Sequence, residues 1–79
     1  MTKNELIAKI KNGSDILFKV RNKGYTILTW TDEGIRILEW NKPETARYYK
    51  TERELVDNFL VDGTPLGELA AEVVITEYT

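Results

Sequence analysis

The chain has 79 residues, with 11 Lys and Arg against 13 Asp and Glu, and it contains neither His nor Cys. The missing thiol and imidazole exclude disulfides and thiolate zinc sites and remove the commonest general base, so most enzyme mechanisms lose their central residue. This length predicts one domain, residues 1–79, that buries only about 60% of its unfolded surface.

No stretch approaches the roughly 20 apolar residues that cross a bilayer, and the first residues lack the apolar run of a signal peptide. We therefore expect a cytoplasmic protein that does not associate with membranes. Charge is uneven along the chain: residues 1–50 carry ten basic and six acidic side chains (+4), and residues 51–79 carry one and seven (−6). This asymmetry predicts either ion pairs between the two parts or an acidic surface for a basic partner.

The first predicted element is a short helix. Thr2 and Glu5 have the spacing of a capping box, and the pair Asn12 and Gly13 ends the helical pattern. The apolar face of this helix consists of Leu6, Ile7 and Ile10.

A three-stranded antiparallel meander is predicted next, with strands at 15–21, 25–31 and 35–41. The strands are separated by the segments NKG and DEG, each of which fits a three-residue turn whose final Gly is left-handed. Such turns place Arg21 opposite Tyr25 and Thr31 opposite Ile35.

That register gives the sheet two faces. The face expected to be the core consists of Ile16, Phe18, Val20, Thr26, Leu28, Trp30, Arg36, Leu38 and Trp40. The two Trp side chains would cover the ends of this core beneath the helices. A two-residue turn at Glu33 and Gly34 is the alternative for the second hairpin, and it would move Ile35 and Ile37 to the core face.

The opposite face is predicted to be an exposed apolar patch, because the helices can cover only one side of the sheet. Its apolar members are Leu17, Tyr25, Ile27, Ile35 and Ile37. A patch of this kind marks a protein partner or a second copy of the chain. The alternative is that the first helix or residues 73–79 fold over it.

After the meander, residues 41–50 are predicted to be a connection, because Pro43 cannot continue a ladder and no period is sustained. A second capping box, Thr51 with Glu54, opens another helix that the pair Asp62 and Gly63 ends. A short third helix is predicted over 65–73, with Leu66, Leu69 and Val73 facing inward. Residues 73–79 are β-prone and either add a fourth strand to the sheet or remain outside it.

A nucleic-acid-binding module is the alternative function. Its candidate residues are Lys19, Arg21, Lys23, Arg47 and Lys50, which are interleaved with tyrosines. The sequence pI of about 5.1 and the acidic last third disfavour it. The carboxylates are explained by turns and helix starts, so we expect no enzymatic activity, cofactor or metal.

The order of a helix, a meander and then acidic helices, with the opening phrase NELIAKIKN, resembles small prophage and mobile-element proteins of Gram-positive bacteria. Within that group it is similar to a type of anti-CRISPR protein that inhibits Cas9 through an acidic, DNA-mimicking surface. The resemblance implies a small accessory or inhibitor protein that acts by binding another macromolecule. Together, these patterns predict an α+β protein–protein interaction module that acts through the open sheet face or the acidic helices.

Overall fold

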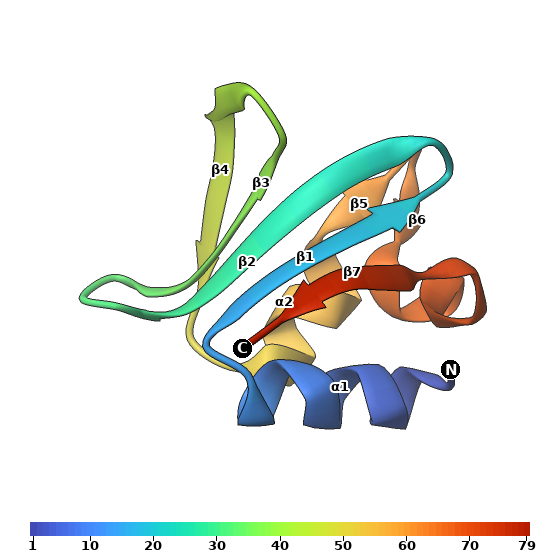
Figure 1. The fold of residues 1–79 in the computed structure, drawn as a ribbon, viewed down its shortest axis with the longest axis horizontal. Coiled ribbons are helices and arrows are strands. Elements are labelled where there is room, and N and C mark those ends of the chain that lie inside the picture. The colour runs from blue at the N-terminus through green and yellow to red at the C-terminus, as the bar shows by residue number, and fades with distance from the viewer.

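The computed structural model describes residues 1–79 and is an α+β fold with an N-terminal helix, an antiparallel sheet and later helices (Figure 1). The elements in chain order are α1 (Lys3–Asn12), β1 (Asp15–Val20), β2 (Lys23–Thr31), β3 (Gly34–Glu39), β4 (Lys42–Tyr49), α2 (Glu52–Asn58), β5 (Leu60–Val61), β6 (Thr64–Pro65), the 3-10 helix η1 (Leu66–Glu72) and β7 (Val74–Tyr78). Five strands form one sheet in the order β4-β3-β2-β1-β7, and β5 and β6 form a separate hairpin.

Helix α1 begins as the capping box predicts. The Glu5 amide donates to the Thr2 hydroxyl at 3.1 Å, and the Thr2 amide donates to the Glu5 carboxylate at 2.8 Å. The bond from the Thr2 amide lowers the pKa of Glu5, since it favours the charged carboxylate. Leu6 and Ile10 of this helix are buried, which fixes the face that α1 turns to the core.

The first hairpin differs from the prediction, and the difference inverts the two faces of the sheet. Its turn has two residues, Arg21 and Asn22, both with positive φ, and Val20 pairs with Lys23. Positive φ at both central residues is typical of a type I′ turn, whose backbone twist matches that of paired strands. Asn tolerates this left-handed region well. Phe18 therefore lies opposite Tyr25, three residues of register away from the predicted pairing.

In the second hairpin, Thr31 pairs with Gly34, whose φ is +112°. The ladder then shifts by one residue at an irregularity between Leu28 and Thr31, so that Ile27 faces Ile37. The predicted three-residue turn and its pairings are wrong. However, β2 and β3 still share their faces as expected, because the register error is an even number of residues.

Residues 42–49 are a strand and not the predicted connection. A tight turn at Trp40 and Asn41 leads into β4, which pairs with β3 from Ile35 opposite Tyr49 to Glu39 opposite Lys42. Pro43 is tolerated because β4 is an edge strand. The register shift between Ile37 and Glu39 breaks the alternation of β4, which explains why its sequence lacks a strand period.

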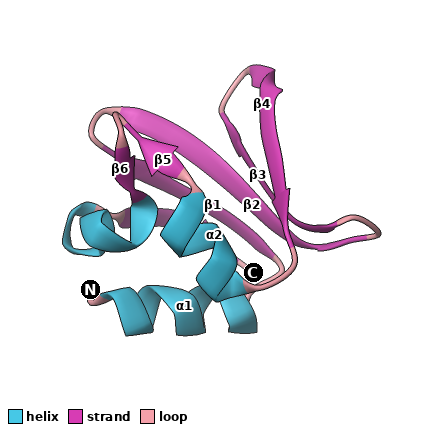
Figure 2. Ribbon diagram, turned by 180° about the vertical axis from the view of Figure 1, so that it is seen from behind, coloured by secondary structure: helices cyan, strands magenta, loops and turns pink.

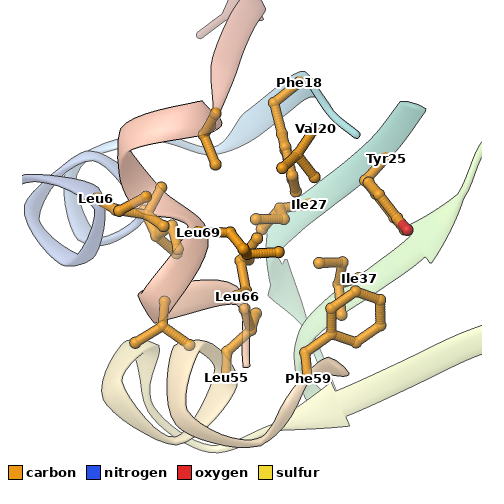
Figure 3. Packing of buried hydrophobic residues seen from close by; sticks show 14 of the residues in the cluster. Leu6, Phe18, Val20, Tyr25, Ile27, Ile37, Leu55, Phe59, Leu66 and Leu69 are labelled. Carbon is orange, nitrogen blue, oxygen red and sulfur yellow. The ribbon is translucent and has the colours of Figure 1, made fainter. Parts of the chain in front are cut away.

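All helices lie on one side of the sheet (Figure 2). Between them and the sheet is a cluster of 17 buried apolar residues, to which β1, β2, β3, α1, α2 and η1 all contribute (Figure 3). Leu66, Leu69 and Val73 point inward as predicted, and residues 74–78 add a strand beside β1. None of the helices has both the length and the apolar content needed to cross a bilayer.

Ion pairs connect the basic and acidic parts of the chain. Lys3 pairs with Asp57, Arg21 Nε lies 3.0 Å from Glu72, and Lys23 Nζ lies 2.8 Å from Asp62. Each pair joins a cation from the first 50 residues to a carboxylate from the last 29. Part of the charge asymmetry is therefore internal complementarity.

Candidate binding surface

The side of the sheet that faces away from the helices is covered by no element of the chain (Figures 1 and 2). Side chains alternate between the two faces along each strand. The residues on either side of the core residues Ile16, Ile27 and Ile37 therefore lie on this surface. We call this surface the open face; its apolar and aromatic members are Leu17, Leu28, Trp30, Leu38, Trp40, Tyr48 and Val74.

Two aromatic side chains of the open face are left in solvent. Trp30, near the end of β2, is 68% exposed, and Tyr48 of β4 is 42% exposed. Between β1, β2 and β3 the face is hollowed by about 340 Å³, and the hollow is lined by Leu17, Thr26, Leu38, Trp40 and Asn41. The surface thus combines a shallow apolar depression with projecting aromatic rings.

Trp40 is held at one side of this hollow by the backbone of Gly24. The Trp40 amide donates to the Gly24 carbonyl at 2.9 Å, and a Cβ added at Gly24 would lie 2.4 Å from the indole. Lys19 Nζ lies 5.6 Å from the ring centroid, within cation–π range. The Trp40 ring is therefore fixed in place, and its Nε1–H is buried without an acceptor.

Arg36 lies in the middle strands of the open face, directly opposite Leu28 on one side and Tyr48 on the other. Its Nε is buried without a hydrogen-bond partner, as is Nε1 of Trp40.

The charges of the open face are mixed. Lys19 and Arg36 are cationic, whereas Asp15 and Glu77, which pair with Leu28 and Leu17, are anionic and lie on the same side by register. Opposite charges in equal number give no uniformly positive field of the kind that attracts a phosphate backbone.

The predicted partner-binding patch was assigned to the wrong face. Tyr25, Ile27, Ile35 and Ile37 belong to the buried cluster and are at most 4% exposed. Of the predicted set, only Leu17 lies on the open face. The physical reason is the two-residue turn at Arg21 and Asn22. It shifts the register by an odd number of residues, so the apolar residues of β1 share a face with Tyr25 and Ile27 of β2.

The prediction that Trp30 and Trp40 cover the ends of the core is also wrong. Both belong to the open face, together with Leu28, Leu38 and Tyr48, and no helix lies above them. The sequence signal that could have located them is Gly24. A glycine inside a strand marks a close approach by another group, here the Trp40 ring.

The candidate nucleic-acid-binding residues do not form one surface. Arg21 and Lys23 are bound to Glu72 and Asp62, and these bonds raise the pKa of both cations. Lys19 is on the open face. Arg47 and Lys23 line one cleft on the helix side of the sheet, and the exposed Lys50 follows β4.

No group of three or more acidic side chains lies close enough together to hold a metal ion. No protein-family model, curated protein or solved structure matches the chain.

Proposed function

We propose that this chain is a binding module that holds another protein against the open face of its sheet. The observation that carries the proposal is the exposure of Trp30 and Tyr48 on the same face of the sheet as a hollow lined by Leu17, Leu38 and Trp40. Trp, Tyr and Arg dominate the energetics of protein interfaces, and this face presents all three.

The rigidity of the surface supports the same function. Trp40 is held by Gly24, and its neighbours lie on hydrogen-bonded strands, so little conformational entropy remains to be lost on binding. A fixed depression is the form of surface that a complementary apolar side chain of a partner can fill, and exposed aromatic rings on the same face can add further contacts.

The charge pattern favours a protein over a nucleic acid as the partner. The open face has carboxylates as well as cations, and two of the five candidate basic residues are already paired within the chain. A role as an accessory or inhibitor of a larger protein fits this surface and does not require the acidic helices, whose Asp57 and Glu72 are engaged internally.

The test compares three tagged forms of the protein in capture from lysate of the source cells, read by quantitative mass spectrometry. The forms are wild type, the double variant Trp30→Ala with Tyr48→Ala, and the control Leu60→Ala, which removes a 56% exposed side chain outside the open face. We expect one stoichiometric protein to bind wild type and the control and to be lost from the double variant.

Two outcomes would contradict the proposal. Equal capture by all three forms would show that the open face does not hold the partner. Loss of all captured material after nuclease treatment, together with a steep dependence on salt, would identify a nucleic acid instead. Sedimentation of the purified protein distinguishes a second copy of the chain from a different partner.

A further inference from the structure

A cleft of about 390 Å³ lies on the helix side of the sheet, where the β3–β4 hairpin stands away from β5 and the end of α2 (Figure 2). We call it the aromatic cleft; its lining residues are Lys23, Tyr25, Glu39, Thr45, Arg47, Tyr49, Asn58, Phe59, Leu60 and Asp62. The volume lies in the range of about 300–1,000 Å³ that small-molecule sites occupy. The cleft is separate from the open face, and binding in it is independent of the function proposed for that face.

The floor of the aromatic cleft presents a hydroxyl from a core position. Tyr25 is only 3% exposed, and its ring stacks on Phe18 at 5.4 Å and meets the edge of Phe59 at 5.5 Å. The hydroxyl is at the end of the ring remote from Phe18 and Val20 (Figure 3), and none of the side-chain hydrogen bonds within the chain involves it. A phenylalanine would serve packing equally well, so the hydroxyl is available to a ligand.

Tyr49 adds a second hydroxyl, also without a partner in the chain, from β4. Burial raises the pKa of both Tyr25 and Tyr49, so both phenols keep their protons at neutral pH. A protonated phenol donates a hydrogen bond. The cleft thus holds two neutral O–H donors with no acceptor in the chain.

Arg47 is the cation of the cleft that no carboxylate neutralises. Its only hydrogen bond is a donation from Nη1 to the Ala46 carbonyl at 2.9 Å. The other charged groups of the lining are occupied: Lys23 is bound to Asp62 at 2.8 Å, and Glu39 lies 3.0 Å from Lys42. Arg47 is therefore the charged group of the lining that remains free to pair with an anion.

We propose that the aromatic cleft binds a small molecule that joins an oxyanion, a carboxylate or a phosphate, to a flat ring. The oxyanion accepts hydrogen bonds from Arg47 and from the hydroxyls of Tyr25 and Tyr49. The ring lies against the apolar wall that Phe59 and Leu60 form. Two basic and aromatic segments of the sequence, 19–25 and 47–50, thus contribute to one site.

The test is an NMR titration of the isotope-labelled protein with three probes: benzoate, phenyl phosphate and the neutral benzyl alcohol. We expect saturable shifts at residues of the aromatic cleft with at least one anion, and binding of benzyl alcohol that is about tenfold weaker or absent. The two anions distinguish a carboxylate ligand from a phosphate ligand.

Matched variants assign the binding to the named donors. Arg47→Gln should weaken binding of the anion about tenfold, whereas Arg53→Gln, on the exposed side of α2, should leave it unchanged. The double variant Tyr25→Phe with Tyr49→Phe keeps both rings and should weaken binding several-fold with an otherwise native spectrum. This pair keeps the test valid if Arg47→Gln disturbs the fold.

Three results would overturn the inference. The first is the absence of saturable shifts with either anion up to about 20 mM, a concentration far above the dissociation constants of specific sites. The second is equal affinity for benzyl alcohol. The third is an equal loss on replacing Arg47 or Arg53, which would mean that the anion responds only to overall charge.

Discussion

The two faces of the sheet differ over a distance of one residue along each strand. Ile27 and Ile37 face each other across β2 and β3 and are wholly buried, whereas the next pair, Thr26 and Leu38, is half-buried and has no layer above it. Both faces carry large apolar side chains, so hydrophobicity alone does not distinguish them. The difference is set by the turn at Arg21 and Asn22. The length of this turn fixes which face of β2 and β3 lies on the same side of the sheet as the apolar residues of β1.

The largest expected effect on stability is that of truncating a core residue, compared with truncating its neighbour on the open face. Ile37→Ala should lower the free energy of unfolding by about 2–5 kcal/mol, because it leaves a cavity in the buried cluster. Leu38→Ala, on the open face, should cost about 1 kcal/mol or less. Urea unfolding of both variants measures the contrast, and equal losses would show that the open face is packed like a core.

A smaller effect is expected at the Trp40 cradle. Gly24→Ala places a methyl group against the indole and should destabilise the protein by about 1–3 kcal/mol through overpacking. In a background where Trp40 is already Ala, the same change should cost much less. A double-mutant cycle with unfolding and Trp fluorescence as readouts checks the coupling, and strict additivity would mean that Gly24 does not position Trp40.

Acid should remove a further part of the stability. Hydrogen bonds from Arg21 and Lys23 hold the pKa of Glu72 and of Asp62 below their ordinary values of 4.5 and 3.8. Because these carboxyls bind protons more weakly in the folded state, their contribution is present above the ordinary values and is lost as pH falls through the folded ones.

The double variant Glu72→Gln with Asp62→Asn tests this contribution. Its urea midpoint should fall less than that of wild type between about pH 7 and pH 3. Asn is suited to the positive φ of position 62, so the turn is preserved. Some acid sensitivity should remain, because the pKa of Glu5 is also lowered. An unchanged acid response would mean that the two ion pairs do not stabilise the fold.

The smallest effect on stability is expected at the exposed rings. Trp30→Ala should change the free energy of unfolding by roughly 0.5 kcal/mol or less, because Trp30 is 68% exposed, and Tyr48→Ala, at a 42% exposed residue, by about 1 kcal/mol or less. Loss of binding without loss of stability would separate the open face from the core in function as well as in packing. A large destabilisation would mean that these rings support the sheet.

Local signals were sufficient for the elements whose ends are fixed by neighbouring residues. The capping box at Thr2 and Glu5 correctly placed α1, and the spacing of Leu66, Leu69 and Val73 gave the buried side of η1. These structures depend on hydrogen bonds and periods that span only a few residues.

The candidate surface could not be derived because its register depends on contacts that are distant in sequence. Gly24 was assigned to a turn, where glycine is common, although the fold requires it beneath Trp40, 16 residues later. The prediction groups Leu28, Trp30, Leu38 and Trp40 correctly on one face of β2 and β3, but it places that face in the core together with Phe18 of β1. Residues 42–49 were missed because the irregular pairing with β3 removes the period that identifies a strand.

The pairing of β7 with β1 also bears on the order of folding. Leu17 and Glu77 are neighbours in the sheet although 59 residues separate them, whereas β1 to β4 can pair in succession as the chain elongates. Closing so long a loop comes late and slows folding. Until β7 docks, β1 is an unsatisfied strand edge, so a chain in which residues 74–78 are detached offers a strand to which another chain can pair.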